Sequence, residues 1–162
     1  MAQAADLEEV KKLLSSVGLP TEDLNPALPN FLLAFVNGAL AGTAGVEVTG
    51  EVGLLRSVAV SDSYRNYGIA RRLVADLTKQ VRLQGVKSLY LITTTADRYF
   101  EKQDFMTVKR DEVPVEVAQS TQFSGLCPSS AVVMKKEIGK PKIKLNELAT
   151  ASSCCSPSSG CC

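Results

Sequence analysis

The stretch that decides the fold reads Leu54-Leu55-Arg56-Ser57-Val58-Ala59-Val60-Ser61-Asp62-Ser63-Tyr64-Arg65-Asn66-Tyr67-Gly68-Ile69-Ala70. Its apolar first half predicts a strand, and the polar residues after it predict a short turn that enters a helix. Where a helix begins, its free backbone N–H groups and the positive end of its dipole point at one place, which suits a phosphate or pyrophosphate. Gly68 lets a ligand come close to the backbone, and the small Ala70 leaves room at the first turn.

The context of this turn strengthens the prediction. A strand, a turn with one glycine and a helix occur in many α/β proteins, so the spacing alone is a weak signal. Here the strand is strongly apolar and the helix is amphipathic. Its apolar face consists of Ile69, Leu73, Val74, Leu77 and Val81. Its basic residues either form a solvated face or bind further phosphate groups of the ligand. They are Arg71, Arg72, Lys79 and Arg82.

Hydrophobic periodicity and turn residues predict the other elements. Helices are expected at residues 5–17, 68–84 and 96–103, with a helical turn at 114–119. Strands are expected at residues 31–36, 39–48, 52–60, 87–94, 106–110 and 131–137. Asn37-Gly38 is a strong hairpin signal between the first two strands. A hairpin group followed by alternating strands and helices predicts an α/β fold with a mixed sheet.

Composition excludes several classes of function. The 162 residues suffice for one domain with a sizeable core, and the net charge of +1 gives no reason to expect a nucleic-acid partner or a membrane surface. The chain has no histidine, which excludes histidine catalysis and histidine-ligated metal. No segment approaches the roughly 18 apolar residues of a transmembrane helix. The acidic start is unlike a signal peptide, so we expect a cytoplasmic protein.

The motif Arg65-x-x-Gly68-x-Ala70, after a strand with a valine-rich end, resembles the central motif of the GNAT superfamily of acetyl-CoA-dependent N-acyltransferases. The resemblance covers residues 5–138 and implies an α/β GNAT fold, with a mixed, mostly antiparallel sheet whose central parallel strands splay apart. It implies acetyl-CoA as cosubstrate, bound between strands 52–60 and 87–94, and direct transfer to a small amine. The pantetheine arm would pair with Val58, Ala59 and Val60, and the pyrophosphate would lie at Arg65, Asn66, Tyr67, Gly68, Ile69, Ala70 and Arg71.

A catalytic acid is implied by the same resemblance. Residues 93–105 are similar to a GNAT pattern in which a tyrosine on a short helix protonates the leaving thiolate. Phe100 stands where that tyrosine would be, and Thr93 stands where an asparagine would be. Tyr99, one residue earlier, is therefore the candidate acid, with simple packing as its alternative role.

Three further polar residues are candidates for the site. Thr93 either binds the CoA arm or the acceptor, or merely ends a strand. Glu47 and Glu51 flank a turn, and either is a candidate base or a solvated carboxylate; Glu47 is our choice. Arg56 lies mid-strand among apolar residues and needs an anionic partner. That partner is one of the two glutamates, or the carboxylate or oxyacid of a substrate.

Three segments narrow the resemblance to the arsenic-resistance branch of GNAT proteins. These are residues 53–60, 89–96 and 122–131, and the last, with Phe123-x-x-Leu126-Cys127-Pro128, is the most distinctive. Related proteins of this branch acetylate the amino group of amino-acid oxyacids such as arsinothricin and phosphinothricin. The resemblance thus implies an amino-acid oxyacid or organoarsenical acceptor, for which Arg56 would be a suitable anion ligand.

Composition changes after Ile138, which divides the chain into a GNAT domain (residues 1–138) and a flexible tail (residues 139–162). Four of the five cysteines lie in the last nine residues, and paired thiolates suit a large thiophilic ion better than tetrahedral zinc. As(III) is the preferred ligand; redox disulfides, a prenylation signal and an inert tail are the alternatives. The candidate ligands are Cys154, Cys155, Cys161 and Cys162.

The sequence therefore predicts an acetyl-CoA-dependent N-acetyltransferase that acts on a small amine. The alternative is a catalytically impaired GNAT-fold protein that binds CoA or As(III). The departures at Thr93 and Phe100 favour the alternative, whereas the intact loop from Arg65 to Ala70 favours the enzyme. Neither nucleic acid nor a membrane is an expected partner, and a homodimer is left open.

Overall fold

The computed structural model describes residues 1–139. The predicted tail lies outside the described residues, apart from Gly139. The same holds for its proposed As(III) ligands Cys154, Cys155, Cys161 and Cys162. In the described part of the chain, no helix combines the length and the apolarity that a membrane crossing needs.

The predicted helices and strands are all present, with ends that shift by a few residues. The helices are α1 (Leu7–Ser16), α2 (Ile69–Leu83), α3 (Asp97–Glu101) and α4 (Val115–Ala118). The strands are β1 (Phe31–Val36), β2 (Ala39–Thr49), β3 (Val52–Val60), β4 (Ser88–Thr93), β5 (Met106–Val108) and β6 (Val132–Glu137). Short turns that the periodicity did not predict complete the order: η1 (Ala4–Asp6), η2 (Asp62–Tyr64), η3 (Arg110–Glu112) and η4 (Gln122–Leu126), the last a single π-helical turn.

The six strands form one mixed sheet in the order β1-β2-β3-β4-β6-β5. β1, β2 and β3 form antiparallel pairs, with Asn37-Gly38 as the predicted hairpin turn. β3 and β4 are parallel, and β6 inserts antiparallel between β4 and β5. The predicted α/β fold with a mixed sheet flanked by helices is confirmed.

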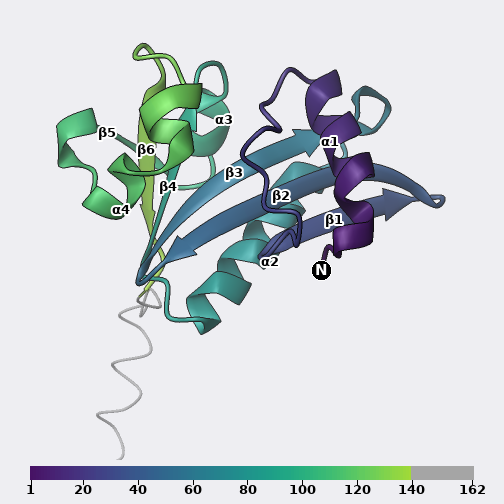
Figure 1. Cartoon of the computed structure of the whole chain (residues 1–162), viewed down its shortest axis with the longest axis horizontal. Helices are drawn as coiled ribbons and strands as arrows, with labels where there is room; N and C mark the ends of the chain where they lie inside the picture. Colours follow the sequence, from purple (N-terminus) through teal and green to yellow (C-terminus); the bar gives the residue numbers. More distant parts are fainter. Residues whose placement is uncertain (140–162) are drawn as a thin grey trace, which may run out of the picture.

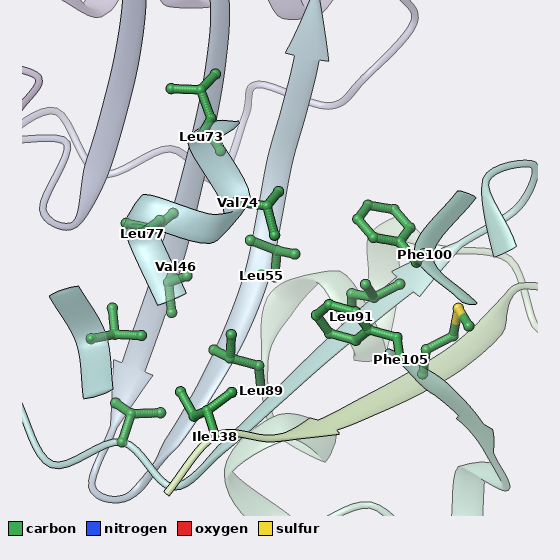
Figure 2. Packing of buried hydrophobic residues seen from close by; sticks show 14 residues of the cluster. Val46, Leu55, Leu73, Val74, Leu77, Leu89, Leu91, Phe100, Phe105 and Ile138 are labelled. Carbon is green, nitrogen blue, oxygen red and sulfur yellow. The ribbon is translucent and has the colours of Figure 1, made fainter. Parts of the chain in front are cut away.

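Helices cover both faces of the sheet (Figure 1). α2 packs on one face, and its apolar residues lie in the main core with residues of β2, β3 and β4. Figure 2 shows Val74 beside Leu55 and Leu77 beside Val46 in this core. Burying such a side chain stabilises the fold by roughly 1.5–3 kcal/mol, so this face holds α2 in place. α1 and α4 pack on the opposite face, in two smaller clusters.

A glycine on β2 sets how close α2 lies to the sheet. A Cβ atom on Gly42 would lie 2.9 Å from Cγ2 of Ile69, the first residue of α2, and 3.2 Å from the backbone oxygen of Ala59. The absent side chain therefore lets the start of α2 rest directly on β2 beside β3. This close packing fixes the helix N-terminus next to the central strands.

Candidate active site

A gap opens where two parallel strands separate. β3 and β4 pair over three residues each, from Val52 opposite Ser88 to Leu54 opposite Tyr90. Beyond these pairs the strands diverge, whereas β4 stays paired with β6 along its whole length. Figure 1 shows β3 and β4 starting together and separating toward α3. The splayed pair confirms the expected gap between the two central strands.

A β-bulge turns β3 beside this gap. The register between β2 and β3 shifts between Thr43, which pairs with Ala59, and Gly45, which pairs with Arg56. Two residues of β3 therefore face a single residue of β2. Ser57 takes a φ of +55°, in the left-handed region that is uncommon for serine. Bulges of this kind re-aim side chains next to functional sites.

A cavity of about 890 Å³ lies between the separated strands β3 and β4. Its walls come from the loop after α1, from β3, from the start of α2, from β4 with α3, and from η4 with the residues that follow it. The cavity thus runs from the N-terminus of α2, past the bulge, to η4 on the far side of the separated strands. Its volume lies in the range of ligand pockets, about 300–1,000 Å³.

The N-terminus of α2 is open at one end of the cavity. Gly68 precedes the helix with a φ of +75°, and a Cβ atom there would meet nothing within 4 Å. The N–H of Arg72 donates to the carbonyl of Gly68 at 3.0 Å, so the N–H groups just before Arg72 have no acceptor within the helix. Arg71 lines the same end and adds positive charge. These groups lie where the sequence predicts an anion site, and their free N–H groups suit a phosphate.

Comparison with known proteins agrees with this geometry. Residues 6–105 match the family model described as the acetyltransferase (GNAT) family. The chain belongs to this family. Its resemblance to GNAT proteins, predicted from the loop at the start of α2, is therefore confirmed.

Two curated GNAT-like relatives match part of the chain. A putative acetyltransferase of Bacillus subtilis is 30% identical over 81 residues, which are 49% of this chain and 55% of that protein. An amino-acid acetyltransferase of Aeromonas salmonicida is 24% identical over 127 residues, which are 71% of this chain and 29% of that protein. The chain thus spans about half of the first relative and under a third of the second.

A solved structure shows the same GNAT fold. N-acetylglutamate synthase from Neisseria gonorrhoeae, in complex with coenzyme A and N-acetyl-glutamate, superposes with a TM-score of 0.72 at 21% identity. The superposition covers 86% of this chain and 34% of the synthase. At this identity the likeness establishes the fold of the GNAT domain alone.

The structure brings nearly all the predicted CoA-binding residues to one cavity. Tyr67 does not line it, and its side chain is 78% exposed. The side chain of Arg65 forms an exposed ion pair with Asp62 at 2.9 Å. The cavity wall includes Val58, Ala59, Val60, Arg65, Asn66, Gly68, Ile69, Ala70 and Arg71.

The two aromatic residues of α3 have different surroundings. Phe100 is buried in the main core, with its ring centroid 5.7 Å from that of Phe105 (Figure 2). Tyr99 lines the cavity, remains 38% exposed and packs edge-on against Phe100 at 5.1 Å. Burial raises the pKa of Tyr99, and the nearby side chain of Gln103 and the charge of Arg71 lower it only in part. Tyr99 therefore keeps its phenolic proton at neutral pH.

The hydroxyl of Thr93 has a local role at the end of β4. Its Oγ1 accepts the backbone N–H of Ala96 at 3.0 Å, and that of Thr95 at 3.4 Å. The residue also lines the cavity. Thr93 therefore shapes the turn before α3, and a role toward the acceptor stays a prediction.

Arg56 lies in a buried ion-pair cluster. Its Nη1 and Nη2 atoms donate to the two carboxylate oxygens of Asp23 at 2.7 and 2.6 Å, and Nη1 also pairs with Glu47. The side chain is 1% exposed, and Nε donates to the hydroxyl of Ser57 at 3.3 Å. Burial alone would lower the pKa of Arg56, but the hydrogen bonds of Asp23 and Glu47 outweigh it and raise that pKa. The guanidinium of Arg56 is thus already paired with two carboxylates of the protein. The sequence had left open a substrate anion as its partner.

The two candidate bases lie away from the cavity wall. Glu47 pairs with Arg56 and lines a separate small hollow beside α4. Glu51 forms an exposed ion pair with Lys87 at 2.5 Å. Glu47 does not line the main cavity. Its role as a base therefore stays a prediction, and it would have to act through a water molecule.

Sequence reasoning missed two residues of the site. Asp23 comes from the loop between α1 and β1, 33 residues before Arg56, and no periodic pattern marks it. Gln122 begins η4, is 8% exposed and lines the cavity. The distinctive sequence of residues 122–131 was the only signal that pointed to this segment.

Proposed function

We propose that this chain transfers the acetyl group of acetyl-CoA to the amino group of a small acceptor. The observation that carries the proposal is the single cavity that links the open N-terminus of α2 to the separated strands β3 and β4. The open N-terminus of α2 suits the pyrophosphate of CoA. The unpaired edges of β3 and β4 suit the amide groups of its pantetheine arm.

The reaction needs few groups from the protein. The neutral amine attacks the thioester carbonyl, the C–N bond forms and the C–S bond breaks. The nitrogen then gives up one proton, to water or to a base, and the CoA thiolate takes up one proton. Holding both substrates in one cavity supplies much of the rate. Tyr99 is the proposed proton donor, because it lines the cavity and stays protonated at neutral pH.

The proposal is tested by the release of free CoA thiol from acetyl-CoA with a panel of amines that includes amino acids and amino-acid oxyacids. We expect thiol release with at least one amine, and mass spectrometry should show one added acetyl group per thiol. If the protein binds acetyl-CoA but no amine releases thiol, the catalytically impaired alternative is the better description.

Replacing Tyr99 with phenylalanine should lower kcat at least tenfold, because a positioned acid contributes roughly 10²–10⁴-fold. The ring contact with Phe100 is kept, so the melting temperature should not change. The raised pKa also predicts that kcat does not fall through loss of this proton between about pH 7 and 9. The matched control is Tyr67→Phe, at an exposed tyrosine outside the cavity. Equal kcat values for the two variants would remove Tyr99 from the mechanism.

The arsenic-related predictions rest on the sequence alone. An amino-acid oxyacid or organoarsenical acceptor is proposed from the resemblance to the arsenic-resistance branch, and the panel includes such compounds. The binding of As(III) by the cysteine tail is proposed from thiolate chemistry and is independent of acetyl transfer. The pairing of Arg56 with Asp23 and Glu47 adds no support for an anionic acceptor.

A further inference from the structure

The far end of the cavity holds a buried amide without a hydrogen-bond partner. Gln122 is 8% exposed, and no hydrogen bond of its side chain occurs among the described residues. Without a protein partner, such an amide forms its hydrogen bonds with water or with a ligand. Its two N–H donors and its oxygen therefore stand ready for a ligand.

The unpartnered amide of Gln122 is not fully enclosed. In the described part of the chain, three side-chain polar atoms are both fully enclosed and unpartnered, on Thr43, Gln103 and Arg110. The amide atoms of Gln122 are not among them, so they still reach open space. Gln122 also lines the cavity, so a ligand bound there lies beside this side chain.

The backbone around Gln122 is held firmly. In η4 and beside it, the carbonyl of Gln122 accepts the N–H of Cys127 at 3.1 Å. Arg110 donates to the carbonyl of Pro128 at 2.8 Å and places its guanidinium 5.0 Å from the ring centroid of Phe123. Single π-helical turns are frequent at functional sites. These contacts fix the backbone that carries Gln122 in the cavity wall.

The cation that lines this end of the cavity is already paired. In the described chain, the charged residues that line the cavity are Arg56, Arg65 and Arg71. The last two lie at the start of α2, on the side expected for CoA, and Arg56 is paired with two carboxylates. Cys127 is uncharged at neutral pH, because burial raises the pKa of its thiol. Arg110 lies behind this wall, where it binds the carbonyl of Pro128 and stacks on Phe123. Among the described residues, no unpaired cation therefore lines this end of the cavity.

From these observations we infer that Gln122 binds the acceptor, and that the acceptor is a small primary amine carrying a neutral carboxamide. This inference rests on the proposed acetyl transfer, and it competes with the oxyacid acceptor that the arsenic-resistance resemblance suggests. A carboxamide offers one oxygen and two N–H groups, so it can both accept from and donate to Gln122. A carboxylate or oxyacid offers acceptors alone and would leave the oxygen of Gln122 without a donor. Gln122 thereby selects the acceptor by its neutral amide group.

The test compares three acceptors with one carbon skeleton: alaninamide, alanine methyl ester and alanine. The α-amino group of the ester, like that of alaninamide, is less basic than that of alanine. The ester lacks the carboxamide N–H groups, so comparing the two separates hydrogen bonding from the reactivity of the amine. For the wild-type protein, kcat/KM for alaninamide should exceed that for the ester at least about tenfold, because sites built to hydrogen-bond a group reject analogues that lack it. Alanine should be the poorest of the three.

The same comparison is made with Gln122→Met, which keeps the length of the side chain and removes its hydrogen bonds. This variant should lose the preference for alaninamide over the ester, with acetyl-CoA affinity unchanged. The control Thr121→Ala, at an exposed neighbour, should keep the preference. The inference is overturned if wild-type protein does not favour alaninamide, if alanine is the best of the three, or if Gln122→Met retains the preference. If no amine of any kind is acetylated, the proposed function itself fails.

Discussion

Replacing Gly68 with aspartate is expected to weaken acetyl-CoA binding well over tenfold, which corresponds to more than about 1.4 kcal/mol. A Cβ atom at this position points into open space, so the new carboxylate fits sterically. It would lie at the start of α2, beside the free N–H groups that are proposed to hold the pyrophosphate. Two like charges would then compete for one helix N-terminus. Isothermal titration calorimetry with acetyl-CoA measures the change.

The matched control for this variant is Gly68→Asn. Asparagine and aspartate have nearly the same shape, and both tolerate a positive φ, as Asn66 does in the same loop at +67°. The two variants therefore share any backbone strain at the φ of +75° and differ in charge. The asparagine variant should keep most of the affinity, and added salt should narrow the difference. If the aspartate variant folds and binds as tightly as wild type, the pyrophosphate lies elsewhere.

Local patterns predicted the elements that form the site. The apolar face of α2 recurs at helical spacing, and its residues Leu73, Val74, Leu77 and Val81 are all buried. Asn37-Gly38 accounts for the first hairpin because both residues take positive φ angles, 50° and 80°, as its turn requires. Such signals are readable because each depends on residues that are close in the sequence.

Other features of the site depend on contacts across long stretches of sequence. The sequence showed that Arg56 needs an anion and offered Glu47, but Asp23 sits in a loop without periodicity, and chain folding alone brings it to Arg56. The turn η4 has no helical pattern of its own and is held by Arg110 from outside the segment. The separation of β3 from β4 was expected from resemblance to GNAT proteins, since both strands are simply apolar in sequence.

Replacing Arg56 with methionine is expected to lower the free energy of unfolding by about 3–5 kcal/mol, the usual cost of removing one partner from a buried ion pair. The side chain of Asp23 is 8% exposed, so its charge would remain buried without a partner. Glu47 is 43% exposed and can regain water. The loop that carries Asp23 also contributes Val17–Pro20 to the cavity wall, so KM for the amine should rise as well. Urea unfolding measures the stability.

Two further variants separate the buried charge from the lost packing of the arginine. Adding Asp23→Leu to the methionine variant should recover much of the stability, because a buried ion pair replaced by apolar residues of similar size is often neutral or stabilising. Arg72→Met removes an exposed ion pair with Asp76, and it should cost less than about 1 kcal/mol. The interpretation is wrong if Arg56→Met costs no more than this surface control. It is also wrong if the double variant is no more stable than Arg56→Met alone, since the unpaired carboxylate would then not be the source of the loss.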